Sequence, residues 1–259
     1  PYALYARHIL KLEAAPMIGE EPDARDRGSL VHAVSEALVK DGIDPSAPDA
    51  PEALRAVIAR VFSRLDAFPA LAATWSARLS ALVPDLLDYE AGRIALGLTR
   101  HAEASGAMTI DIAGEPFRLR GRADRIDLHG DGRVDIIDFK TGKPPSRKQV
   151  EAGLAPQLPM EMAMVLDGAF EGIVAAAPGD LIHVQIGAGR GGFKEQAQPA
   201  GNLHDKVRGE LEALIALMRQ EGFAFAAQRR PAPRRFAGDY DHLARLSEWG
   251  MESDADETG

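Results

Sequence analysis

One stretch of the sequence constrains the fold more than any other: residues 121–140, GRADRIDLHGDGRVDIIDFK. Its apolar residues alternate or form short β-branched blocks, and a Gly-Asp-Gly turn at residues 130–132 separates two such runs. This pattern predicts two antiparallel strands joined by a tight turn. Because residues i and i+2 of a strand share a face, Asp138 and Lys140 lie on one face of the second strand. The hairpin brings Asp124 of the first strand toward them.

Two carboxylates beside an ammonium group suit one kind of chemistry. Magnesium prefers oxygen ligands, and Asp124 and Asp138 supply them while leaving positions for water and a phosphate oxygen. Such a metal lowers the pKa of bound water and neutralises charge on a phosphoryl group. Lys140 could orient the attacking water or stabilise the developing oxyanion. The alternative is a surface hairpin with solvated charges, but Asp138 ends an apolar run, where a carboxylate needs a partner or an ion.

These residues resemble a known family. The pattern GxxD, a hairpin and an apolar strand ending in DFKTG resembles the PD-(D/E)xK nuclease superfamily, and specifically its RecB-like branch. Residues 28–32, GSLVH, resemble the G-x-x-x-H helix motif of that branch, and Pro156, Gln157 and Leu158 resemble the start of its Q-x-x-x-Y motif. The segments PYALYARHILKL and GDYDHLARLSEW resemble the C-terminal nuclease domain of AddB, a helicase-nuclease subunit of double-strand break repair.

The resemblance implies a restriction-endonuclease-like α/β fold, with a mixed β-sheet flanked by helices and an N-terminal helical elaboration. It implies a metal-dependent deoxyribonuclease, an exonuclease belonging to an ATP-dependent helicase-nuclease, with DNA and an AddA-type partner subunit as its partners. The implied metal is magnesium, with manganese as a substitute. The implied metal ligands are His32, Asp124, Asp138 and the Phe139 carbonyl, and the implied catalytic residues are Asp124, Asp138, Lys140 and Gln157.

The sequence departs from this family pattern in two respects. Many AddB proteins bind an iron-sulfur cluster through cysteines, and this sequence contains no cysteine, so we expect no such cluster. The tyrosine position of Q-x-x-x-Y, counted from Gln157, is occupied by Glu161. A DNA contact is therefore either lost at this position or replaced by a carboxylate.

We expect a single RecB-like nuclease domain over residues 1–259, cut from a longer chain because it begins with Pro1 rather than Met. Residues 1–104 are predicted to be mostly helical and to carry His32, with a long helix over about 70–104 bent near Pro84. Glu103 lies near the site only if the following strand begins there. Residues 105–220 are predicted to hold the catalytic sheet, and 221–259 a C-terminal extension. No apolar run reaches membrane length, and with the absence of cysteine this favours the cytoplasm.

The formal net charge of −9 argues mildly against a nucleic-acid partner. However, part of the acid excess lies outside the motif region, in residues 20–26 and 252–257. Around the hairpin, basic residues cluster in the sequence and predict a basic rim beside the acidic pocket: Arg122, Arg125, Lys143, Arg147 and Lys148. We expect DNA contacts from Arg122, Lys143, Arg147 and Lys148. A later segment with Arg229, Arg230, Arg234 and Arg235 is a DNA contact, a contact to the parent protein, or a solvated loop.

Two other functions remain open at this point. The chain could be a catalytically inactive DNA-binding or scaffold module that retains the nuclease fold, as its acidic charge and Glu161 suggest. It could also be a free-standing RecB-like exonuclease of the kind associated with CRISPR systems. The missing initiator methionine and missing cysteines count against this last possibility.

Overall fold

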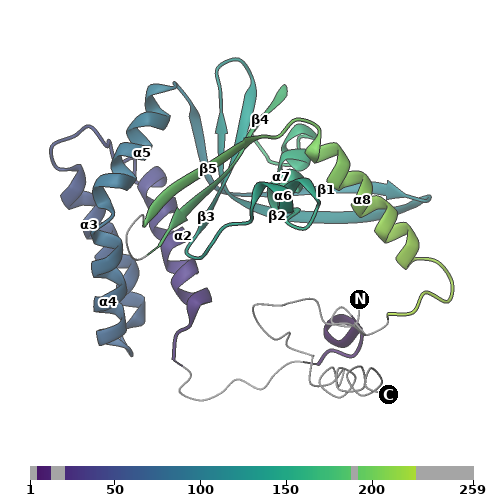
Figure 1. Cartoon of the computed structure of the whole chain (residues 1–259), viewed down its shortest axis with the longest axis horizontal. Helices are drawn as coiled ribbons and strands as arrows, with labels where there is room; N and C mark the ends of the chain where they lie inside the picture. Colours follow the sequence, from purple (N-terminus) through teal and green to yellow (C-terminus); the bar gives the residue numbers. More distant parts are fainter. Residues whose placement is uncertain (1–4, 13–20, 188–191, 226–259) are drawn as a thin grey trace, which may run out of the picture. The chain divides into compact units, whose positions relative to one another are not determined.

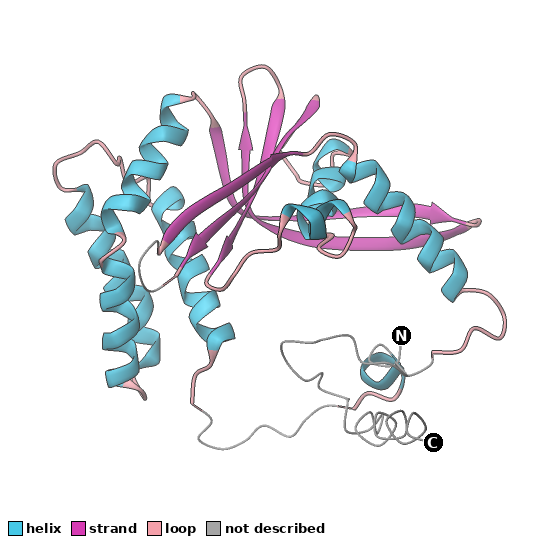
Figure 2. Cartoon of the chain, viewed as in Figure 1, coloured by secondary structure: helices cyan, strands magenta, loops and turns pink. Residues whose placement is uncertain are grey.

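A five-stranded mixed sheet forms the centre of the structure, a computed structural model that describes residues 5–12, 21–187 and 192–225. The strands follow one another in sequence order: β1 (Thr99–Ile112), β2 (Glu115–Leu128), β3 (Arg133–Lys140), β4 (Ala177–Ile186) and β5 (Phe193–Pro199). Strands β3 and β4 pair in parallel, and the other neighbours pair antiparallel. Helices flank this sheet, as Figure 2 shows, which confirms the predicted restriction-endonuclease-like α/β architecture.

The predicted hairpin is formed by β2 and β3, with Arg125 opposite Ile137 and Leu128 opposite Val134. Its turn needs glycine at Gly132, which has a φ of 85° and whose added Cβ would lie 2.9 Å from the Ala176 Cβ. The helices on one side of the sheet are α2 (Ala24–Lys40), α3 (Ala50–Phe62), α4 (Pro69–Ser80) and α5 (Val83–Ala95). On the other side are α6 (Arg147–Glu151), α7 (Gln157–Leu166) and α8 (Leu203–Met218), as Figure 1 shows.

Adjacent residues of β3 supply two separate cores because side chains alternate across a strand. Ile137 and Phe139 pack with Val31 and Val34 of α2 and with the buried face of α3. Ile136 packs on the opposite face, where Leu158 and Met162 of α7 cover the sheet. The sheet therefore fixes α2 and α7 on opposite faces of the strand that ends in Asp138 and Lys140.

The predicted long helix over residues 70–104 is wrong in two places. It is two helices, because Pro84 lies in the first turn of α5 instead of inside a bent helix. The helical region also ends before residue 99: Gly97, with a φ of 69°, follows α5, and β1 begins at Thr99. The strand thus takes in Glu103, which lay inside the predicted helical region.

Arg125 does not belong to a basic rim, because it is buried with only 1% of its surface exposed. Its Nη1 lies 2.7 Å from Glu90 Oε1 of α5, and its Nε lies 2.6 Å from Asp127 Oδ1. Arg93 of α5 extends this buried network, with Nε 2.8 Å from Asp127 Oδ2 and Nη2 2.7 Å from Asp135 Oδ2. The network attaches α5 to β2 and β3.

The chain divides by contacts into two compact units. Glu21–Ala216 contains the sheet and all the candidate site residues, and Pro1–Glu20 with Leu217–Gly259 forms the other unit. In that second unit, Tyr5 stacks on Phe225 with ring centroids 6.2 Å apart. The four arginines of residues 229–235 lie outside the described residues. Within the described part, no helix is both long enough and apolar enough to span a membrane.

Candidate active site

Helix α2 carries His32 to the sheet. The helix begins with a capping box in which Asp23 and Asp26 satisfy the first backbone N–H groups, and it buries Leu30 and Val31 beneath it. His32 lies at the edge of this buried face, with Nδ1 3.0 Å from Asp124 Oδ1 of β2. Burial alone would lower the His32 pKa, but the hydrogen bond to Asp124 and the nearby carboxylate charges outweigh it and raise the pKa above 6.5.

The end of the hairpin brings together the predicted carboxylates and the lysine. Asp124 Oδ2 accepts a hydrogen bond of 2.9 Å from the Phe139 N–H, so each of its oxygens is held in place. Asp138, with 1% of its surface exposed, accepts a hydrogen bond of 2.7 Å from Lys140 Nζ through Oδ1. Burial raises the Asp138 pKa, while the charge of Lys140 acts in the opposite direction. The Phe139 backbone also helps to raise the His32 pKa.

Helix α7 completes the constellation from the other face of the sheet. Lys140 Nζ donates to Gln157 Oε1 at 3.2 Å, and Gln157 Nε2 donates to Glu161 Oε1 at 3.2 Å. Gln157 and Glu161 are four residues apart and thus share one side of the helix. Burial raises the pKa of Glu161 to about 8, and the charges of Asp124 and Asp138 also raise it. The structure therefore brings together every predicted catalytic and metal-binding residue, while their roles stay predictions.

Glu103 was not among the predicted site residues, although it lies at the same place. It is a residue of β1 with a left-handed φ of 52°, and it interrupts the β1–β2 ladder opposite Asp124. Ligand atoms of His32, Glu103 and Asp124 lie within 4.8 Å of one another, a spacing that could hold a metal ion. Arg122 Nε lies 2.5 Å from Glu103 Oε2. Burial raises the Glu103 pKa in spite of this arginine.

A cavity of about 500 Å³ adjoins this group. His32, Glu103 and Asp124 line it together with Arg25, Arg64 and Arg122. Arginine guanidinium groups around a carboxylate cluster suit an anionic polymer whose phosphate reaches a metal. Of the residues predicted to contact DNA, only Arg122 lines this cavity; Lys143, Arg147 and Lys148 are exposed on the loop after β3 and on α6.

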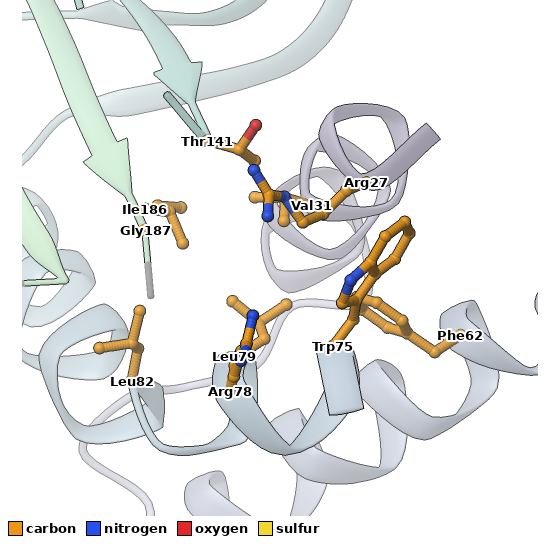
Figure 3. Close-up of a pocket in the computed structure, with 10 residues that line it drawn as sticks. All are labelled: Arg27, Val31, Phe62, Trp75, Arg78, Leu79, Leu82, Thr141, Ile186 and Gly187. Atoms are coloured by element: carbon orange, nitrogen blue, oxygen red, sulfur yellow. The ribbon is translucent and has the colours of Figure 1, made fainter. Parts of the chain in front are cut away.

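A much smaller pocket, about 30 Å³, lies beside the first half of α2, where Arg27 and Val31 line it (Figure 3). Arg27 extends from α2 over the Trp75 ring of α4, with its guanidinium carbon 6.0 Å from the ring centroid. Thr141, which directly follows β3, lines the pocket with them. The volume suits about one water molecule, so we assign this contact to the attachment of α2 rather than to substrate binding.

The chain is similar in sequence to longer, uncharacterized proteins. The chain is 31% identical over 170 residues to an uncharacterized protein of Rickettsia bellii and 30% identical over 174 residues to the uncharacterized protein RC0550 of Rickettsia conorii. Each match covers 66% of this chain but only 20% and 21% of the relative, so the chain spans about a fifth of their length.

A solved structure, the crystal structure of SSO0001, is 19% identical over 64% of this chain and 72% of that chain, with a TM-score of 0.30. The model of the PD-(D/E)XK nuclease superfamily matches residues 1–234. Together with the convergence of Asp124, Asp138 and Lys140 at the end of a β-hairpin, this match shows that the chain belongs to the PD-(D/E)XK nuclease superfamily.

Proposed function

We propose that this chain is a metal-dependent deoxyribonuclease module of the RecB-like branch, similar to the C-terminal nuclease domain of AddB. Its reaction would be phosphodiester hydrolysis, in the exonuclease mode, during the processing of DNA ends in double-strand break repair. One observation carries the proposal: His32, Asp124, Asp138 and Lys140, from α2 and two strands, converge around the Phe139 backbone.

The residues present fit a divalent metal. Imidazole nitrogen and carboxylate oxygen are ligands for magnesium and manganese, and Asp138 keeps a buried oxygen, Oδ2, with no hydrogen-bond partner among the described residues. His32, Asp124 and Asp138 would hold the ion together with the Phe139 carbonyl, and Glu103 adds an oxygen within reach. When bound, the cation supplies Lewis-acid charge for a phosphoryl oxygen and lowers the pKa of a water.

Lys140 is the residue best placed to act on the reacting atoms. Its ammonium is held from two sides, by Asp138 Oδ1 at 2.7 Å and by Gln157 Oε1 at 3.2 Å. An ammonium group has a further N–H donor, which is free to orient a water or to stabilise charge on a phosphoryl oxygen. With one-third of its side chain exposed to solvent, Lys140 remains open to a substrate.

The cavity with Arg25, Arg64 and Arg122 supports a DNA strand as the substrate, because its positive groups flank the carboxylates that would hold the metal. The matched region is about a fifth of each relative's length. The AddA-type partner subunit is proposed from the resemblance to AddB alone. We also propose that the protein acts in the cytoplasm, where DNA end processing takes place.

The proposal is tested by cleavage of linear single- and double-stranded DNA with Mg²⁺, using wild type, Lys140→Ala and Lys40→Ala. Lys40 is the matched control because it lies at the end of α2, paired with Glu36 and away from Asp138. Lys140→Ala should lower the cleavage rate by about 10²–10³-fold, as expected for the loss of a charge-stabilising donor. Lys40→Ala should cleave at the wild-type rate.

Cleavage that is unaffected by Lys140→Ala, or that persists with EDTA, would contradict the proposal. A second candidate function is an inactive DNA-binding module, favoured by the replacement of the motif tyrosine with the buried Glu161. DNA binding in Ca²⁺ without cleavage at any concentration of Mg²⁺ or Mn²⁺ would support that function instead.

A further inference from the structure

Glu161 is the residue at which this chain departs from its family motif, and its environment is unusual. It lies on α7 with 6% of its surface exposed. Its Oε1 accepts the hydrogen bond from Gln157, but its Oε2 is buried and has no partner in the part of the chain that the structure describes. A buried carboxylate oxygen without a partner is costly, so this position calls for a ligand.

Asp138 shows the same arrangement at the other end of the same hydrogen-bonded chain. Its Oδ1 is held by Lys140, whereas Oδ2 is buried and has no hydrogen-bond partner within the described ranges. Lys140 and Gln157 link the two carboxylates through contacts of 2.7, 3.2 and 3.2 Å. Each acid thus has one oxygen fixed by a hydrogen bond and one left over, and the Lys140 ammonium contacts Asp138 directly but is linked to Glu161 only through the Gln157 amide.

Protonation of Glu161 would not give its buried Oε2 a hydrogen-bond partner among the described residues. Because Gln157 Nε2 donates to Oε1, the proton would sit on Oε2, where no acceptor lies among the described residues. A hard divalent cation is the kind of partner that suits such leftover carboxylate oxygens. Magnesium is commonly held by only one or two carboxylates, with water and substrate phosphate completing its shell.

We propose that Asp138 Oδ2 and Glu161 Oε2 are ligands of a second divalent cation, on the α7 side of Asp138. The first cation would be the one held by His32, Asp124 and the Phe139 carbonyl with Glu103 within reach, and Asp138 would be shared between the two ions. The inference therefore deepens the proposed function and rests on it. Asp138 is linked to both positions. The neighbouring Phe139 N–H binds Asp124, and Lys140 with Gln157 connects Asp138 to Glu161. Tyrosine at residue 161 would offer no carboxylate and would leave only the first position.

The number of Mn²⁺ ions bound per chain tests the second site directly, without any need for cleavage. We expect calorimetric and electron paramagnetic resonance titrations of the wild-type chain to give two Mn²⁺ per chain. Glu161→Gln is nearly isosteric and keeps an acceptor for Gln157, and it should bind one Mn²⁺, as should Glu161→Tyr. Glu103→Gln should weaken the other site roughly tenfold or more and retain the second. Glu151→Gln is the control, because Glu151 is paired with Arg147 on exposed α6, and it should still bind two.

Crystals of the wild-type chain soaked in Mn²⁺ keep the inference testable even if a variant fails to fold. We expect an anomalous peak about 2 Å from Glu161 Oε2. Two Mn²⁺ in Glu161→Gln, or a peak only beside His32 and Asp124, would overturn the second site and leave the proposed function intact. No Mn²⁺ binding by the wild type would overturn both.

Discussion

In the metal-free chain, His32 and Asp124 share a hydrogen bond of 3.0 Å at the position proposed for the metal ion. The carboxylate stabilises the imidazolium and raises the His32 pKa above 6.5 in spite of burial. We therefore expect NMR titration of the metal-free chain to give a His32 pKa above 6.5, and Asp124→Asn to bring it down. Because the folded pKa is the higher one, the stability that this pair contributes is complete below the unfolded pKa. It is lost as the pH rises through the folded pKa.

A His32 pKa that is unchanged in Asp124→Asn would show that the 3.0 Å contact does not control the imidazole. The His129 signals provide an internal control in the same spectra, because His129 pairs with Asp135 and not with Asp124.

Glu103 holds a backbone conformation that an L-residue adopts at a cost. Glycine adopts a φ of 52° without this cost because it has no Cβ. We therefore expect the Glu103→Gly protein to be about 1 kcal/mol more stable than the Glu103→Ala protein in urea unfolding. Ser105, two residues along β1 and without a positive φ, should show the opposite order, because glycine weakens an ordinary strand. The same order at both positions would contradict the assigned strain.

At this scale the sequence predicted which residues lie close together where those residues belong to motifs. Asp124, Asp138 and Lys140 are fixed by strand alternation within one hairpin, so short-range reasoning was enough to place them together. Glu103 carries no such signal, since its place in the site depends on a strand that begins at Thr99 and on a φ that its neighbours do not reveal. The partners of Glu161 likewise depend on how α7 packs over β3.

At the scale of elements, the attachment of α5 to the hairpin depends on Arg93. This side chain holds two buried carboxylates, Asp127 and Asp135. Removing it leaves both charges buried with less compensation, so Arg93→Ala should lower the free energy of unfolding by about 3–5 kcal/mol. Arg55→Ala, which breaks an exposed pair with Glu52 on α3, should cost at most about 1 kcal/mol. Equal costs in chemical denaturation would show that the network does not stabilise the fold.

The elements that the sequence predicted correctly are those with a strong local signal. The hairpin of β2 and β3 follows from alternation and a Gly-Asp-Gly turn, and α3 from its apolar period after Pro51. The boundary between α5 and β1 was missed because residues 96–104 carry no apolar periodicity. Their strand structure comes from pairing with β2, as in Thr99 opposite Leu128, which is a tertiary effect.

At the scale of the whole molecule, the candidate site draws on both faces of one sheet. Helix α2 supplies His32, β1 supplies Glu103, the hairpin supplies two acids and a lysine, and α7 supplies Gln157 and Glu161. The negative total charge of −9 did not predict the cavity, because the three arginines that line it come from separate elements. Net charge describes the entire surface, whereas a nucleic acid responds to the local arrangement.

The most direct test of the account is the hydrolysis of linear DNA by the wild-type chain and by Asp138→Asn, with Mg²⁺, Mn²⁺ or EDTA. Asparagine keeps the size of Asp138 and removes the buried charge that holds Lys140 and that we propose as a metal ligand. We predict cleavage by the wild type with either metal and none with EDTA, and a rate at least about 100-fold lower in Asp138→Asn. Equal rates for the two proteins, or no cleavage by the wild type with either metal, would contradict the account.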